Sequence, residues 1–408
     1  YVEGYSVDGA HDAGLAYEQV LRRAPAERGV ELLSADELDY ERARACAGGA
    51  GAVPDNIFFS RGRGLVRGRG DTSKFTIYDG VFSSKTALAG LRAVLEEQKW
   101  RFAPTTLETY ARCPFDYFVT RILGVEVVEE PERMVSIAPG DRGTLVHQIL
   151  ARLFREFQER GFLPLSAAPA EDVFKIVDTV VTRILDEFSK TNPVGLPVFW
   201  EMDKRLVRES VRVFVEEERL EDDGFVPAQF ERWFGGDRDG IDVSYECGGR
   251  AVSFLGRIDR IDTAADGRFR VIDYKTGRLA GKDQDIAHGM ALQLPIYLIA
   301  AARILEAEIR AGEARYRHVG AGGGPSAVLF SGSRWDESSA GFEKTIDVIT
   351  RGIERGIFFA PANDEACRYC DVRVACTAGM PRLFARKAEN DERAREYMDL
   401  RAGTEEAE

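Results

Sequence analysis

Apolar side chains recur every three or four residues between residues 144 and 160, which predicts a helix with one buried face. Similar spacing predicts further helices over Glu171–Lys190, Asp203–Glu221 and Ile286–Leu305, and Pro295 should kink or delay the last of them. The tail from about Pro381 is rich in arginine and glutamate and is expected to form an exposed helix.

Two strands are expected between the second and third groups of helices. They cover Ala251–Asp262 and Arg268–Lys275, and the Asp266-Gly267 pair between them is a strong signal for a hairpin turn. Strands set among helices in this way predict an α/β fold, with a mixed sheet flanked by helices.

The first hundred residues are weakly patterned. A helix is expected over Ala16–Arg23, followed by a loop-rich stretch over Ala47–Gly70. Arginine and glycine alternate from Arg61, so this stretch is either a mobile loop that contacts phosphate or a plain surface loop. Thr105 and Glu108 have capping-box spacing and are expected to open a short helix.

Composition is that of an ordinary globular protein of 408 residues, with 44% hydrophobic residues and a net charge of −13. The negative charge argues against a nucleic-acid partner unless a local basic lining or a basic subunit supplies the contacts. No apolar run approaches the roughly 18 residues of a membrane span, and no signal peptide is visible, which favours a cytoplasmic protein. A chain that begins at Tyr1 is expected to be a fragment of a longer polypeptide.

The hairpin carries the candidate chemistry. Pairing about Asp266-Gly267 puts Asp259 opposite Asp273–Tyr274, and strand alternation puts Asp273 and Lys275 on one face. Two carboxylates beside a lysine suit Mg²⁺ (or Mn²⁺) and a phosphodiester substrate. The alternative is a surface hairpin whose charged residues have no common role.

Six cysteines are too few for a disulfide scaffold, and four of them suit a metal or cluster site. Cys367, Cys370 and Cys376 lie close together in the sequence, and Cys113 is the natural fourth ligand. Structural zinc is the alternative to an iron–sulfur cluster. Cys46 and Cys247 lie outside the pattern.

Four motifs in order resemble those of the RecB-type PD-(D/E)XK nucleases: Gly143–His147, Gly256–Asp262, Val271–Gly277 and Gln293–Tyr297. The resemblance implies a restriction-endonuclease-like sheet. It implies metal ligation by His147, Asp259, Asp273 and the carbonyl of Tyr274, catalysis by Lys275, and supporting roles for Gln293 and Tyr297. Glu231 is a weaker candidate for a further acid. On position alone, His147 could equally be a packed core residue, and Gln293 and Tyr297 ordinary surface residues.

The cysteine arrangement resembles that of the AddB family and of the CRISPR-associated four-cysteine nucleases. The resemblance implies a [4Fe–4S] cluster on Cys113, Cys367, Cys370 and Cys376, which links the two ends of the nuclease domain. It also implies Mg²⁺-dependent exonuclease activity on DNA in double-strand break repair and recombination, beside an AddA-like helicase–nuclease subunit. The expected domains are the end of a helicase-like region (1–100), the nuclease domain (101–380) and a charged helical tail (381–408). A stand-alone exonuclease and a non-catalytic DNA-binding scaffold are the alternatives.

Overall fold

The computed structural model describes residues 57–98, 100–126, 134–236, 241–277, 279, 291–320, 327–361, 367–368, 370–376 and 380–402. The chain divides into two compact units, residues 1–67 and 68–408, and the architecture below belongs to the second. The helix expected over Ala16–Arg23 lies outside the described residues. Among the helices that are described, none has the length and apolar character to cross a membrane.

A five-stranded mixed sheet forms the centre of this unit, in the order β2-β5-β6-β7-β8. All neighbours are antiparallel except β6 and β7, which are parallel and joined through helix α11. The strands are β2 (Phe225–Phe234), β5 (Gly256–Ala264), β6 (Phe269–Lys275), β7 (Gly312–His318) and β8 (Ala327–Ser331). The expected mixed sheet is therefore confirmed.

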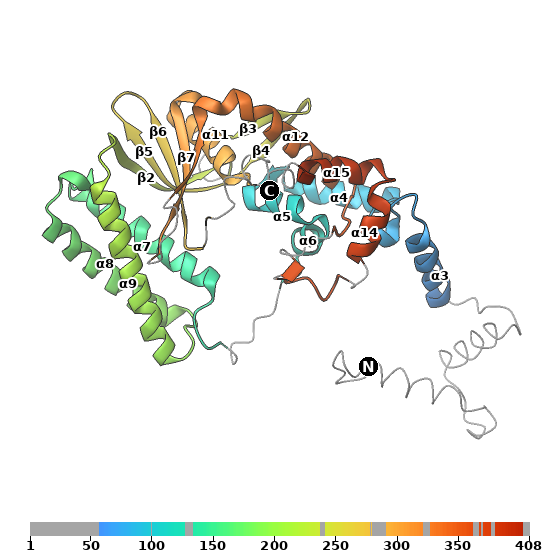
Figure 1. The fold of residues 1–408 in the computed structure, drawn as a ribbon, viewed down its shortest axis with the longest axis horizontal. Helices are drawn as coiled ribbons and strands as arrows, with labels where there is room; N and C mark the ends of the chain where they lie inside the picture. The colour runs from blue at the N-terminus through green and yellow to red at the C-terminus, as the bar shows by residue number, and fades with distance from the viewer. Residues whose placement is uncertain are drawn as a thin grey trace, which may run out of the picture. The chain divides into compact units, whose positions relative to one another are not determined.

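Helices cover both faces of the sheet. One face packs against α7 (Pro139–Glu159), α8 (Ala170–Thr191) and α9 (Pro197–Leu220), as Figure 1 shows. The opposite face packs against α11 (Gln293–Leu305) and α12 (Trp335–Glu354). Strand β6 serves both cores because alternate residues point to opposite faces. Ile272 and Tyr274 belong to the first core, and Phe269 and Val271 to the second.

The predicted helices form, with different starting points. Pro139 and Pro197 occupy the first turns of α7 and α9, where a missing backbone N–H costs nothing, so both helices begin earlier than expected. Helix α11 begins at Gln293, and Pro295 lies in its first turn. The proline therefore marks the start of this helix.

The strand expected over Ala251–Asp262 is in fact two strands in different sheets. Arg250–Phe254 forms β4, which pairs with β1 (Arg101–Phe102) and β3 (Ser244–Cys247) in a three-stranded sheet. The break lies at Leu255, whose N–H donates to Phe102 O at 3.1 Å. The next residue, Gly256, lies so close to the ring of Phe234 that a Cβ there would be 2.8 Å away. This close packing lets the chain pass from one sheet to the other.

The arginine- and glycine-rich stretch was predicted as a loop, but residues Ile57–Gly70 form helix α3. Tertiary contacts offset the helix-weakening effect of its glycines. A Cβ at Gly68 would lie 2.7 Å from the ring of Tyr78, and Gly68 O accepts a hydrogen bond from Lys387 Nζ at 2.7 Å. A contact of this kind cannot be read from local sequence.

The C-terminal tail was predicted to be an exposed helix, which is also wrong. It forms α14 (Met380–Ala388) and α15 (Glu392–Ala402), and Phe384, Lys387 and Tyr397 are buried. Lys387 Nζ donates to Asp79 Oδ2 at 2.7 Å, so a buried ion pair fixes α14. The tail packs on residues 75–81, and the domain boundaries proposed from sequence remain predictions.

The remaining helices are short or peripheral. They are α4 (Lys85–Glu97), α5 (Pro104–Arg112), α6 (Pro114–Tyr117), a π-helical turn (Phe118–Ile122) and 3₁₀ turns at Ile77–Asp79, Leu165–Ala167, Ile309–Ala311 and Gly332–Arg334.

Candidate metal centre and nuclease site

The register of the β5–β6 hairpin brings the first two predicted site residues together. Arg260 pairs with Ile272, which puts the predicted pairing within one residue of the observed one. Asp259 lies one position further along, and its Oδ2 accepts a hydrogen bond from the N–H of Tyr274 at 2.8 Å. The hairpin prediction therefore located this carboxylate correctly.

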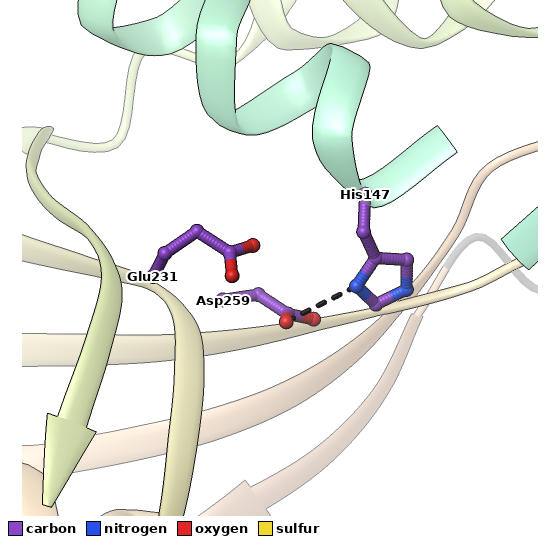
Figure 2. Close-up of side chains that lie close together, drawn as sticks. All are labelled: His147, Glu231 and Asp259. Carbon is purple, nitrogen blue, oxygen red and sulfur yellow. Dashed lines mark hydrogen bonds and ion pairs between the residues drawn. The ribbon is translucent and has the colours of Figure 1, made fainter. Parts of the chain in front are cut away.

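Helix α7 brings His147 onto the same point. Its Nδ1 lies 3.1 Å from Asp259 Oδ1, and its Nε2 lies 3.0 Å from the carbonyl oxygen of Tyr274. Figure 2 shows the imidazole pointing from α7 toward Asp259. Burial lowers the pKa of His147, but the hydrogen bond and charge of Asp259 outweigh it, and the net shift is upward. Both ring nitrogens face oxygen acceptors, which suits the doubly protonated form.

Glu231, the weaker candidate in the sequence, completes the most compact set of ligand atoms. Among the described residues, atoms of His147, Glu231 and Asp259 all lie within 4.8 Å of one another. Glu231 has a φ of 54°, a strained conformation for a residue inside strand β2. Its Oε2 also lies 2.7 Å from Arg257 Nε. The structure thus gives Glu231 a more central position than its sequence motif suggested.

Asp273 and Lys275 lie at the end of β6. Lys275 Nζ is 2.5 Å from Asp273 Oδ2 and donates to Gln293 Oε1 at 2.8 Å. Burial raises the pKa of Asp273 to about 6; Lys275 opposes this shift, and the charge of Asp259 adds to it. The three carboxylates therefore repel one another in a partly buried site. A bound cation would relieve that repulsion.

Two residues near Lys275 were not anticipated. Tyr316 on the parallel strand β7 is aligned with Asp273, and its ring centroid lies 4.9 Å from Lys275 Nζ. Glu108, interpreted as part of a capping box, lies within α5, whose N-cap is Ala103. Its carboxylate reaches the start of α11 instead. Neither contact has a local signal in the sequence, because each joins distant segments.

These groups surround one cavity of about 560 Å³. Tyr297 lines it, with its ring edge-on to Phe234, and Trp233 and Arg257 lie at the same cavity. The full lining is Ala103, Pro104, Thr105, Pro139, Gly140, Gly143, His147, Trp233, Leu255, Gly256, Arg257, Asp259, Asp273, Tyr274, Lys275, Thr276, Gly277, Gln293 and Tyr297. Every metal or catalytic residue proposed from the sequence lines this cavity.

The cysteines lie in a different region. Cys113 caps α6, accepting from the N–H of Asp116 at 3.5 Å. Burial raises its pKa to about 12, and the neighbouring Cys370 thiol adds to the shift. Burial also raises the pKa of Cys376, with Cys367 and Cys370 adding to it. The thiols are therefore electrostatic neighbours. Among the described residues, however, they do not form a ligand set as compact as the one around His147.

A histidine, buried carboxylates and a lysine around one cavity at the edge of a mixed sheet define a metal-binding site suited to phosphodiester hydrolysis. The family model of the PD-(D/E)XK nuclease superfamily matches residues 101–377. This chain belongs to that superfamily, and its mixed sheet flanked by helices is a restriction-endonuclease-like fold.

Several bacterial relatives of this chain are named as a subunit of an ATP-dependent helicase/deoxyribonuclease, the one known as AddB. The protein from Thermoanaerobacter sp. (strain X514) is 30% identical over 214 residues, which are 50% of this chain and 18% of the relative. That of Heliobacterium modesticaldum is 32% identical over 208 residues, covering 50% and 17%. That of Clostridioides difficile is 28% identical over 252 residues, covering 56% and 21%. The chain thus spans about a fifth of the length of these relatives.

Proposed function

We propose that this chain hydrolyses DNA phosphodiester bonds with Mg²⁺ or Mn²⁺, as the nuclease part of an AddB-like protein. The observation that carries the proposal is the convergence of His147, Glu231 and Asp259 on one cavity with Lys275. Their ligand atoms lie within 4.8 Å of one another, and Lys275 lines the same cavity.

The donor set suits a hard divalent cation. We infer that His147, Glu231, Asp259, Asp273 and the carbonyl of Tyr274 hold it, because oxygen atoms dominate this set. When bound, such a cation polarises a phosphodiester and lowers the pKa of its bound water. Before the metal binds, the imidazole of His147 must lose a proton from one ring nitrogen.

Lys275 supplies positive charge beside these carboxylates. Its ammonium is held by Asp273 and by the amide oxygen of Gln293, so it is fixed in direction without being neutralised by a second acid. From this position it can orient the attacking water or stabilise charge on the phosphoryl oxygens. Tyr297 and Tyr316 confine the same space, and Tyr316 lies beneath the ammonium.

The four cysteines are proposed to bind a [4Fe–4S] cluster. Cys113, Cys367, Cys370 and Cys376 influence one another's pKa, which supports a common site. Four thiolates on a single zinc ion would lie within about 4.6 Å of one another, twice the Zn–S distance of about 2.3 Å. Cluster ligands are spread more widely, because each binds a different iron. The looser arrangement of these cysteines therefore supports the cluster over zinc.

The names of the relatives support an AddA-like partner, exonuclease action in double-strand break repair and a cytoplasmic location. The stand-alone exonuclease and the non-catalytic scaffold remain the alternatives, and a cleavage experiment separates both from the proposal.

The test is cleavage of end-labelled DNA by anaerobically purified protein with Mg²⁺. Wild type is compared with Lys275→Ala and with Lys175→Ala, a matched control on the exposed face of α8. Cleavage by wild type and the control, with a loss of about 10²- to 10³-fold in Lys275→Ala, supports the enzyme. Cleavage that appears only after an AddA-like protein is added rules out the stand-alone exonuclease. DNA binding without cleavage under both conditions would identify a scaffold.

A further inference from the structure

Helix α11 carries Gln293 at its first position but cannot cap its own N-terminus. The N-cap residue, Leu292, has an apolar side chain, and Pro295 has no N–H. Nearly every side chain from Leu294 to Ala302 is buried, so the start of this helix lies inside the protein. Its first backbone N–H groups therefore need an acceptor from elsewhere.

Glu108, on α5, supplies that acceptor. Its Oε1 accepts hydrogen bonds from the N–H of Leu292 at 2.7 Å and from the N–H of Gln293 at 3.1 Å. A carboxylate at a helix N-terminus is also stabilised by the helix dipole. One oxygen thus holds the two backbone groups that immediately precede and contain the Gln293 position.

Gln293 in turn holds the lysine. Its side-chain oxygen accepts from Lys275 Nζ at 2.8 Å, and the hydroxyl of Tyr316 lies 3.5 Å from the same oxygen. We propose that Glu108 is a positioning residue, which fixes the start of α11 and through Gln293 sets the direction of Lys275. This inference rests on the proposed nuclease function and assigns Glu108 a role within that site.

The helix that carries Glu108 also borders two other parts of the protein. Pro104 and Thr105 in its first turn line the cavity, and its C-cap is Cys113. Tyr397 from the C-terminal helix donates to Ala111 O at 2.7 Å, and Tyr110 donates to Ile357 O at 2.7 Å. The position of Glu108 is therefore set by a short, well-anchored helix. A carboxylate on such a helix can hold α11 at a fixed height.

The first test uses amide hydrogen exchange and needs no cleavage. In the full 408-residue chain, Glu108→Ala should speed exchange at Leu292 and Gln293 by about tenfold or more, because it removes two charge-assisted hydrogen bonds. Glu108→Gln keeps an acceptor oxygen and should give a smaller increase. The matched control is Glu354→Gln, which weakens an ion pair with Arg250 outside the cavity. Unchanged exchange in Glu108→Ala would overturn the proposal.

The second test is a double-mutant cycle with Gln293→Ala, measured well below the melting temperature. Glu108→Gln alone should lower kcat by about 10- to 100-fold, as is typical of residues that orient an active group. KM and Mg²⁺ affinity should stay within about twofold, because the proposed metal ligands lie outside α11. In the Gln293→Ala background the same change should cost less than about twofold. Additive effects, or an equal loss of Mg²⁺ affinity, would mean that Glu108 acts on general stability and would overturn the proposal.

If wild-type protein and an AddA-like partner together cleave no DNA, the proposed function fails. The exchange measurement still decides whether Glu108 orders the start of α11, so the two failures are distinguishable.

Discussion

At the edge of the main sheet, His147, Asp259 and Tyr274 are held together by hydrogen bonds of 2.8 to 3.1 Å, and Lys275 is held by two further side chains. In the cysteine-bearing segments, the thiols are electrostatic neighbours with raised pKa values, but their sulfur atoms are not gathered into a compact set. The protein therefore builds the first site by itself. The second depends on the group it binds.

This difference separates two ways in which bound metal acts. Removal of the divalent cation should leave the hairpin and α7 in place, because strand pairing and helix packing position their side chains. Loss of the proposed cluster should instead loosen the segment around Cys367–Cys376, where the described chain is mostly turns. Substitutions at each site can test this contrast.

The largest effect is expected for Asp259→Asn. Asparagine keeps an oxygen that can accept from the N–H of Tyr274, so the hairpin should fold, but the negative charge is lost. Cleavage should fall by about 10³-fold or more, and Mg²⁺ binding measured by calorimetry should disappear. The control is Asp266→Asn in the exposed hairpin turn. Cleavage within about tenfold of wild type would contradict the assignment of Asp259 as a ligand.

A second prediction concerns the cysteines. Cys113→Ser should abolish the brown absorbance of the purified protein and lower the melting temperature by about 5 °C, because a long cross-link between distant segments is lost. Amide exchange in residues 367–376 should rise while that of β5 and β6 stays unchanged. Cys247→Ala, a buried cysteine outside the set, should keep the absorbance. Equal loosening of the sheet would show that the two sites are not built independently.

The sequence was most informative where function depends on local spacing. The alternation of Asp273 and Lys275 and the turn at Asp266-Gly267 set the register of the hairpin to within one residue. His147 follows from helical periodicity, because it shares α7 with residues of the buried face. These features depend on neighbours a few positions away.

Contacts between distant segments could not be predicted in this way. The capping box assigned to Glu108 has the correct spacing, but its carboxylate is used by α11. The arginine- and glycine-rich stretch was taken for a loop, yet contacts with Tyr78 and Lys387 accompany a helix. Tyr316 reaches Lys275 only because β7 lies parallel to β6. In each case the deciding partner is remote in the sequence.

The smallest expected effect concerns pH and Mg²⁺ affinity. The pKa of Asp273 is raised to about 6 by burial, and metal binds the ionised carboxylate, so protons compete with metal as pH falls. Apparent affinity at pH 5.5 should be at least about fourfold weaker than at pH 7.5, from the protonated fraction of Asp273 alone. His147 acts in the same direction, since its pKa is raised and its doubly protonated form cannot ligate.

Lys275→Ala sharpens this measurement. The charge of Lys275 lowers the pKa of Asp273, so its removal should move the midpoint of the affinity curve to higher pH. The strand itself should be unaffected, because Lys275 lies at its end. Calorimetric titration of Mg²⁺ at constant ionic strength over pH 5.5 to 8 measures both curves. Coincident midpoints would mean that Asp273 does not control metal binding, and the site would then depend mainly on His147, Glu231 and Asp259, whose ligand atoms already lie within 4.8 Å of one another.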